Sequence, residues 1–174
     1  TGDIGKLFLD AIKFRGKVFN VDPNKKMIEE GKKKLKNIKN ITWHVENAEK
    51  LSFKKNSFEY YTISFGLRNT KNINKSLKEA YRVLKPGGRF LCLEFSKITN
   101  PSLDFFYKNY SKIIPIFGNM IVGKREPYEY LIESINQFVN QDELIDCMEI
   151  SGFKNCYYRN LSGGIVAIHS GWKI

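Results

Sequence analysis

Short runs rich in β-branched and aromatic residues alternate with amphipathic stretches through most of the chain. The run at 58–64 is mainly aromatic or β-branched, whereas the apolar residues of the stretch at 72–84 recur at intervals typical of a helix. Strands that alternate with helices are joined by right-handed crossovers, which place the helices against the sheet. The sequence therefore predicts an α/β fold with a mostly parallel sheet and helices on both faces.

Turn residues and periodicity place the individual elements. The expected strands are 17–22, 41–46, 58–64, 89–95, 157–161 and 165–170, and the expected helices follow Asp3, begin at Pro23, and cover 72–84, 128–138 and 141–151. A turn is expected at 85–88. The residues expected to face inward are Ile4, Leu7, Phe8, Ala11 and Ile12 in the first helix and Met27, Ile28 and Leu35 in the second.

Two regions depart from the alternation. Only Ser162, Gly163 and Gly164 separate the last two strands, a gap too short for a parallel crossover, so we expect an antiparallel hairpin at the sheet edge. The segment at about 100–140 is too long and too apolar for a simple connection. It predicts a helical insertion that covers a site, with additional core as the alternative.

The chain has 174 residues, 42% of them hydrophobic, which is sufficient for one domain with a core. It opens on Thr1, within what reads as a glycine-containing turn that should follow a strand. We therefore expect 1–174 to be a single domain lacking its N-terminal portion, including the first strand. That portion could also hold a targeting sequence.

The net charge of +11 predicts attraction to anionic surfaces and leaves nucleic acid and anionic lipid open. Much of the excess falls on one predicted helix, where a solvated lysine face is the simpler interpretation. Cys92, Cys147 and Cys156 form no CxxC pair and have no histidine at ligand spacing, so we expect reduced cysteines and no metal site. No apolar run approaches the roughly eighteen residues that span a bilayer.

Two features indicate an adenosine-containing cofactor. The turn at Thr1, Gly2 and Asp3 leads into a helix, where backbone N–H groups can approach a ligand closely. Asp22 ends the next strand about twenty residues later, the spacing at which a carboxylate accepts hydrogen bonds from a ribose diol. The structural alternative is that Asp22 caps the following helix.

A separate feature lies at 64–69, where polar groups gather at the end of a predicted strand. Parallel sheets bind ligands at such strand ends.

A series of motifs extends over essentially the whole chain. They are TGDI at 1–4, DPNKKM at 22–27, ENAE at 46–49, ISFGLRN at 63–69, YRVLKPGGR at 81–89, LEFS at 93–96, PYEYLIESI at 127–135 and NLSGGIVAIHSGWK at 160–173. Together they resemble the ubiquinone/menaquinone biosynthesis C-methyltransferase family. The resemblance implies a Rossmann-like class I methyltransferase fold and S-adenosylmethionine as the cofactor.

The resemblance also implies roles for five residues at the cofactor. Thr1 would lie at its methionine end, Asp22 at the ribose hydroxyls, and Asn47 with Ala48 at the adenine. Ser64 would line the cofactor from the end of its strand. The chain departs from the family pattern in two places, because the glycines before Thr1 are absent and Pro23 replaces a bulkier residue.

The family reaction is the transfer of a methyl group to a ring carbon of a polyprenyl methoxyphenol or benzoquinol. The side chain of Arg68 suits stabilisation of the phenolate, because its guanidinium stays protonated and offers several donors. For the same reason it is a poor base, so Asn69 is expected to orient a water molecule or the substrate oxygen. We predict that Arg68 and Asn69 are the catalytic pair.

The resemblance favours a polyprenyl benzoquinol of ubiquinone biosynthesis as substrate. It also suggests contact with other quinone-biosynthesis proteins, peripheral contact with anionic membrane, and a homodimer, whereas no nucleic acid is expected. A eukaryotic source would imply the matrix side of the mitochondrial inner membrane, and any other source the cytoplasm. The alternatives are a menaquinone-pathway C-methyltransferase, a non-catalytic scaffold subunit that binds S-adenosylmethionine, a basic RNA methyltransferase, and a nicotinamide dehydrogenase, which the incomplete glycine pattern disfavours.

Overall fold

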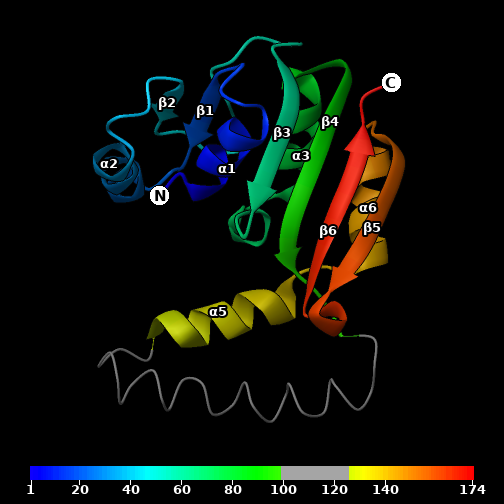
Figure 1. Ribbon diagram of the computed structural model, residues 1–174. Coiled ribbons are helices and arrows are strands. Elements are labelled where there is room, and N and C mark those ends of the chain that lie inside the picture. Colours follow the sequence, from blue (N-terminus) through cyan, green and yellow to red (C-terminus); the bar gives the residue numbers. More distant parts are fainter. Residues whose placement is uncertain (99–125) are drawn as a thin grey trace. The chain divides into compact units, whose positions relative to one another are not determined.

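The computed structural model describes residues 1–98 and 126–174 (Figure 1). The chain forms two compact units, Thr1–Lys54 and Lys55–Ile174. Most of the predicted insertion, from 99 to 125, lies outside the described residues. The expectation of a single domain stays a prediction.

The first unit is a two-stranded parallel sheet accompanied by two helices. Its elements are α1 (Asp3–Ala11), β1 (Val18–Val21), α2 (Lys25–Lys34) and β2 (Ile41–His44). The strands pair from Val18 with Ile41 to Val21 with His44, so their carboxyl ends meet at one edge. The core of this unit consists of Leu9, Leu35 and Ile41, with Val18, Ile38 and Trp43 packed against them.

The predicted inward faces of both helices are partly wrong. Leu7 is 62% exposed and Met27 is 40% exposed. Ile4 and Ile12 are also exposed. The buried residues of α1 are instead Gly5 and Leu9.

Glycines explain the difference, because they let each helix approach its strand closely. A Cβ atom on Gly5 would lie 3.0 Å from Val18 Cγ1, and one on Gly31 would lie 2.3 Å from Trp43 Cζ3. The buried line of α2 accordingly includes Ile28 and Gly31. The apolar periodicity counted large side chains and gave no weight to these small ones.

The second unit contains a four-stranded mixed sheet in the order β3-β4-β6-β5 (Figure 1). Its elements are β3 (Phe58–Ser64), η1 (Leu67–Asn69), α3 (Ile73–Val83), β4 (Leu84–Phe95), α5 (Glu126–Gln137), α6 (Gln141–Ile150), β5 (Lys154–Leu161), η2 (Ser162–Gly164) and β6 (Val166–Trp172). Strands β3 and β4 are parallel, whereas β6 is antiparallel to both of its neighbours. The C-terminal hairpin at the sheet edge is confirmed, and α5 confirms a helix in the C-terminal part of the predicted insertion.

The turn expected at 85–88 is an irregularity inside β4. Leu84 pairs with Phe58 and Arg89 pairs with Tyr60, so the intervening residues of β4 bulge from the ladder. Gly87 has a φ of 78°, a conformation that glycine adopts readily. The strand therefore begins earlier than the sequence predicted.

Helices α3 and α6 pack on one face of this sheet, behind it in Figure 1. The core between them contains Leu77, Ala80, Phe90, Cys92, Leu144, Met148 and Phe153. Asn72 and Asn140 begin the two helices with side-chain N-caps, and Asn140 forms a capping box with Glu143. In the described part of the chain, no helix has both the length and the apolar character needed to cross a membrane.

Candidate functional site

The carboxyl ends of β1 and β2 carry three of the predicted cofactor residues. Asp22 follows β1 directly and is half-buried, and its Oδ1 accepts a hydrogen bond from the Asn24 N–H at 2.7 Å. Asn47 and Ala48 lie in the loop after β2, where Asn47 Oδ1 accepts from the Glu49 N–H at 3.0 Å. Both polar side chains are thus held by Asx-turns that involve a residue only two positions away.

Thr1 stands immediately before Gly2, the N-cap of α1. Its hydroxyl donates to Asp3 Oδ2 at 2.6 Å. Hydrogen bonds from Lys34 and from Thr1 lower the pKa of Asp3 to about 2. The structure thus engages the Thr1 hydroxyl with a neighbouring carboxylate, and its contact with the methionine end of the cofactor stays a prediction.

The donors and acceptors of this edge fit an adenosine-containing cofactor. Asp22 Oδ2 makes no hydrogen bond to any described residue, so one carboxylate oxygen is available to a ribose hydroxyl. Helix α1 begins without a side-chain cap, so no side chain satisfies the N–H groups of its first turn. The contacts of Asp22 with the ribose and of Asn47 and Ala48 with the adenine stay predictions.

The second unit presents a different strand end. Ser64 ends β3 and pairs with Leu93 of the parallel β4. The next residue, Phe65, has a φ of 54°, in the left-handed region that residues other than glycine rarely adopt. Its N–H still bonds to Leu93 O at 2.8 Å, and its ring lies 4.9 Å from the ring of Phe95. Backbone strain of this kind is concentrated at functional sites.

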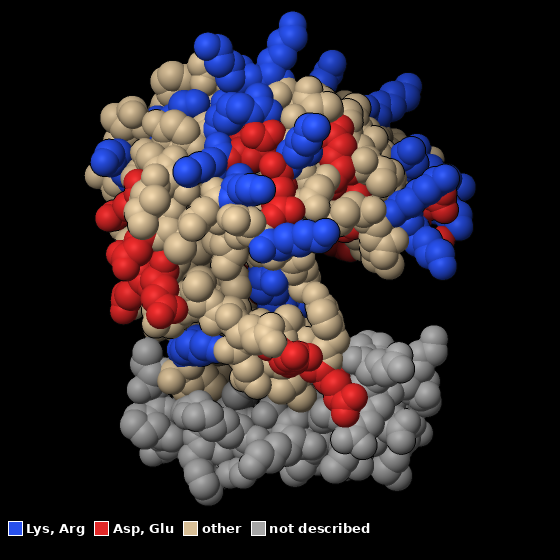
Figure 2. Space-filling model, turned by 180° about the vertical axis from the view of Figure 1, so that it is seen from behind, with Lys and Arg blue, Asp and Glu red and all other residues tan. Residues whose placement is uncertain are grey.

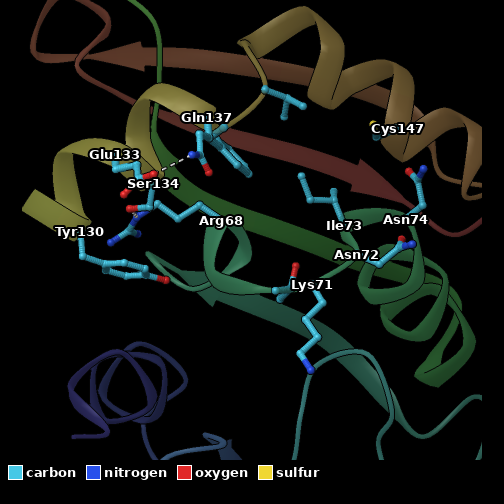
Figure 3. A pocket seen from close by; sticks show the side chains of 13 residues that line it. Arg68, Lys71, Asn72, Ile73, Asn74, Tyr130, Glu133, Ser134, Gln137 and Cys147 are labelled. Carbon is cyan, nitrogen blue, oxygen red and sulfur yellow. Dashed lines mark hydrogen bonds between the residues drawn. The ribbon is translucent and has the colours of Figure 1, made fainter.

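Arg68 lies in η1, immediately beyond this turn, and its side chain is only 8% exposed. Its Nη1 donates to Glu94 Oε1 at 2.8 Å and to the Phe65 carbonyl at 2.7 Å, while Nε donates to Ser134 Oγ at 3.3 Å. The guanidinium also lies over the ring of Phe95, 5.2 Å from the centroid. Ser134 comes from α5, so elements far apart in the sequence hold this side chain (Figure 3).

These contacts leave one end of the guanidinium available. An arginine side chain has five N–H donors, two on each Nη atom and one on Nε. The contacts of Arg68 engage both donors of Nη1 and the donor of Nε, and Nη2 makes no hydrogen bond within the described residues. The side chain is thus a fixed cation with one pair of donors that has no partner in residues 1–98 and 126–174.

The structure also brings Asn69 beside Arg68, as the predicted catalytic pair requires. Asn69 Nδ2 donates to the Phe65 carbonyl at 3.3 Å, so both side chains bond to the same oxygen. The Tyr130 hydroxyl donates to Asn69 Oδ1 at 3.1 Å. Asn69 and Tyr130 are exposed, in contrast to Arg68, and the catalytic role of the pair stays a prediction.

A pocket of about 490 Å³ adjoins Arg68 (Figure 3). Arg68 and Tyr130 lie toward one end of it and Cys147 lies toward the other. Its volume is within the range of small-molecule sites. The lining is of mixed polarity and consists of Arg68, Thr70, Lys71, Asn72, Ile73, Asn74, Tyr130, Glu133, Ser134, Gln137, Phe138, Val139 and Cys147.

Sequence reasoning missed Glu94 and Ser134, the side chains that hold Arg68. Glu94 did leave a signal, because it follows Phe90 and Cys92 at every second residue of β4 and so shares their buried face. An acid at a core position near a strand end needs a cationic partner. Ser134 gave no comparable signal, since it lies 66 residues from Arg68 in the chain.

The remaining candidate residues are the cysteines, a buried histidine and potential metal ligands. All three cysteines are free, and burial raises the pKa of the fully buried Cys92. His169 is buried in β6 with Nε2 3.1 Å from Gln141 O. No cluster of three or more potential metal ligands occurs in residues 1–98 and 126–174.

Comparison with known proteins shows the family to which the chain belongs. Residues 1–173 match the model of the ubiE/COQ5 methyltransferase family. The chain is 51% identical to "Ubiquinone/menaquinone biosynthesis C-methyltransferase UbiE" of Rickettsia prowazekii (strain Madrid E), over 100% of this chain and 73% of the relative. It is 44% identical to "2-methoxy-6-polyprenyl-1,4-benzoquinol methylase, mitochondrial" of Dictyostelium discoideum, over 100% of this chain and 66% of that protein.

Solved structures support the fold. A SAM-dependent methyltransferase from Aquifex aeolicus matches with a TM-score of 0.65 at 14% identity, over 92% of this chain and 70% of that one. This likeness confirms the class I methyltransferase fold, and the family match extends over both strand ends described above. The chain therefore belongs to the ubiE/COQ5 methyltransferase family and is an S-adenosylmethionine-dependent methyltransferase.

Proposed function

We propose that this enzyme methylates a ring carbon of a polyprenyl methoxy-benzoquinol in ubiquinone biosynthesis. The observation that carries the proposal is the match of the whole chain to two relatives whose names specify quinone chemistry. One is named a C-methyltransferase of ubiquinone and menaquinone biosynthesis, and the other a 2-methoxy-6-polyprenyl-1,4-benzoquinol methylase. Both names describe addition of a methyl group to a quinone precursor.

The reaction requires an electron-rich ring. When bound, S-adenosylmethionine supplies an electrophilic methyl group on sulfur. The ring carbon forms a bond to this methyl group as the carbon–sulfur bond breaks, and the ring then loses a proton to restore aromaticity. Negative charge on a ring oxygen promotes the attack, so a fixed cation beside that oxygen lowers the barrier.

Arg68 is the residue proposed to supply this cation. Its Nη2 donors are uncommitted among the described residues, and the guanidinium is held in place by neighbours on three sides. A donor that needs no reorganisation during the reaction stabilises developing charge most effectively. Because the guanidinium cannot release a proton near neutral pH, Arg68 acts as an electrostatic group and does not take the ring proton itself.

Asn69 is proposed to orient the oxygen that receives the ring proton. Its amide is fixed at both ends, by the Phe65 carbonyl and by the Tyr130 hydroxyl, while the side chain is exposed. A water molecule or the substrate oxygen held by Asn69 would accept the proton. The cofactor residues proposed with this pair are Thr1, Asp22, Asn47, Ala48 and Ser64.

The experiment that tests the function uses S-adenosylmethionine with an isotopically labelled methyl group. The enzyme is incubated separately with 2-methoxy-6-polyprenyl-1,4-benzoquinol and with the corresponding menaquinone precursor, and the products are analysed by mass spectrometry. Label on a ring carbon of the benzoquinol supports the proposal. Label only on the menaquinone precursor supports the menaquinone alternative, and no label on either supports a scaffold subunit.

Peripheral contact with an anionic membrane is proposed because a polyprenyl substrate resides in lipid and the chain carries a net charge of +11. Figure 2 shows basic side chains interspersed with acidic ones on one face of the molecule. Part of the charge on α2 is neutralised locally, since Lys33 pairs with Glu30 at 2.7 Å and Lys34 pairs with Asp3. Flotation with liposomes should therefore increase moderately with anionic lipid content, and flotation independent of that content contradicts the proposal.

The location proposed for a eukaryotic source is the matrix side of the mitochondrial inner membrane, supported by the mitochondrial name of the Dictyostelium relative. For a bacterial source the proposal is the cytoplasm. Contact with other quinone-biosynthesis proteins and a homodimer are further proposals. Fractionation of the source cells tests the location, co-purification from those cells tests the contact with other proteins, and light scattering of the purified protein tests the dimer.

A further inference from the structure

The proposed chemistry leaves one buried charge unused. Glu94 is completely buried at the carboxyl end of β4, on the face that also carries Phe90 and Cys92. Burying a carboxylate is unfavourable unless a cation and hydrogen-bond donors satisfy it. In the proposed chemistry the ring proton goes to an oxygen held by Asn69, so Glu94 takes no part in it. The partners of Glu94 therefore indicate why the residue is there.

Both oxygens of Glu94 face the segment that carries the proposed catalytic cation. Oε1 accepts from Arg68 Nη1 at 2.8 Å and from the Phe95 N–H at 2.9 Å. Oε2 accepts from the backbone N–H of Arg68 at 3.3 Å. One carboxylate thus holds Arg68 through its side chain and its main chain together, which fixes the position of η1 as well as the guanidinium.

We infer that Glu94 is the positioning residue for Arg68, an inference that rests on the proposed function of Arg68. The carboxylate takes one Nη1 donor, and the Phe65 carbonyl takes the other. Nη2 is thereby left as the end of the guanidinium that has no partner among the described residues. Glu94 selects which donors face the substrate and does not touch the substrate itself.

Comparison with a second arginine pair separates this role from ordinary ion pairing. Arg82 Nη2 lies 2.7 Å from Glu79 Oε1 three residues earlier on α3, with side chains 37% and 15% exposed. The Arg68–Glu94 pair, at 8% and 1%, connects β4 with η1 across 26 residues of sequence. A local pair on a helix stabilises that helix modestly, whereas a buried pair between elements fixes their mutual position.

Glu94→Gln is the informative variant, with Glu79→Gln as the matched control. Glutamine keeps the size of the side chain and one acceptor oxygen, but its NH₂ group must face a donor, because both carboxylate oxygens accept hydrogen bonds. Arg68 should then lose its fixed position. We expect kcat to fall about 10- to 100-fold, the cost of a misplaced catalytic group. The affinity for S-adenosylmethionine should not change, and Glu79→Gln should keep normal turnover.

The double variant Arg68→Ala, Glu94→Gln distinguishes positioning from an independent role. If Glu94 acts through Arg68, its substitution causes no further loss of kcat once Arg68 is absent. A double variant slower than Arg68→Ala by the full factor of Glu94→Gln overturns the inference. Wild-type turnover in Glu94→Gln also overturns it, even if Arg68→Ala is inactive. Wild-type turnover in Arg68→Ala instead contradicts the catalytic role proposed for Arg68, whereas failure to label the benzoquinol contradicts the proposed function.

A measurement on the wild-type protein keeps the inference testable if Glu94→Gln does not fold. NMR of arginine side chains, with the Arg68 signals assigned from Arg68→Lys, reports rotation of the guanidinium. The inference predicts separate, slowly exchanging signals for Nη1 and Nη2. A single averaged signal would show a freely rotating group and would overturn the inference.

Discussion

The two parallel strand ends of this molecule hold their polar side chains in different ways. At the end of β1, Asp22 is fixed by the N–H of Asn24, two residues further along the chain, and keeps one oxygen free of described partners. At the end of β3, Arg68 is fixed by Glu94 and Ser134, which lie 26 and 66 residues away. The first arrangement is local and open, and the second is tertiary and nearly closed.

This difference suggests a division of labour between the strand ends. A side chain held by its neighbours and left accessible is suited to bind a ligand that arrives and leaves. A buried charge held from several elements is suited to remain in one orientation during a reaction, which is the requirement for electrostatic catalysis. We therefore expect Asp22 to contribute mainly to affinity and Arg68 mainly to turnover.

The largest expected effect is on stability and tests the end of β3, where Arg68 is held by distant residues. Arg68→Met would leave the buried carboxylate of Glu94 without its cation. Removing one partner of a buried ion pair costs about 3–5 kcal/mol, so the free energy of unfolding should fall by that amount. The measurement is denaturant unfolding of both proteins. The control Lys85→Met removes an exposed pair with Glu59 and should cost about 0–1 kcal/mol; equal losses in the two variants would contradict the comparison.

The next effect separates charge from geometry at the same position. Arg68→Lys keeps a cation for Glu94 but removes the forked donors that include Nη2. Loss of one preorganised donor at a developing charge costs about 10²- to 10³-fold in kcat. Steady-state kinetics on the benzoquinol substrate measures this loss. Arg159→Ala, at an exposed position on β5, is the control and should behave as the wild type.

Asp22→Asn tests the end of β1, where the side chain is held locally. Asparagine keeps the oxygen that accepts from the Asn24 N–H, so the turn is preserved, while the carboxylate charge is lost. A hydrogen bond to a charged group contributes about 1.5–3 kcal/mol, which corresponds to roughly 10- to 100-fold weaker binding of S-adenosylmethionine. Calorimetric titration measures the change. Asp10→Asn, on the exposed Lys6 pair of α1, should bind normally.

A smaller effect is expected at Tyr130, an exposed side chain near Arg68. Tyr130→Phe removes the hydrogen bond to Asn69 Oδ1 and keeps the ring. A neutral hydrogen bond contributes about 0.5–1.5 kcal/mol, so kcat should fall only a few-fold. The same kinetic assay applies. A loss as large as that of Arg68→Lys would mean that the orientation of Asn69 matters as much as the donors of Arg68, which contradicts the expected order.

The smallest effect concerns pH and a group outside both strand ends. Burial lowers the pKa of His169 below 6.5, although its bond to Gln141 O and the nearby Asp142 oppose the shift. Between the folded and unfolded pKa values the unfolded chain binds more protons, so stability falls as the pH decreases below about 6.5. His169→Gln should flatten this part of the stability profile, measured by thermal unfolding across pH. An unchanged profile would show that His169 does not cause it.

The same difference between local and tertiary contacts explains how much the sequence could predict. The position of Asp22 depends on a short strand and a turn, and the hairpin depends on a gap of three residues between β-rich runs. Both features depend on neighbouring residues and can therefore be predicted from the sequence. The environment of Arg68 depends on Glu94 and Ser134, and no periodicity identifies partners at such separations.

Helix faces lie between these cases. Periodicity correctly predicted that Ile28 is buried, but it also placed Leu7 inward, which is wrong. The close approach of α1 to β1 is set by the absence of a side chain at Gly5, and that of α2 to β2 by its absence at Gly31. Hydrophobic patterns register large side chains, so contacts made possible by glycine escape them.

The most direct test of the account compares two variants in two assays. S-adenosylmethionine affinity by calorimetry and kcat at saturating cofactor are measured for Asp22→Asn and Arg68→Lys. We expect a crossed result, in which Asp22→Asn weakens affinity with kcat nearly unchanged, and Arg68→Lys lowers kcat with affinity unchanged. If both variants change the same quantity, the two strand ends do not divide binding from chemistry, and the account is wrong.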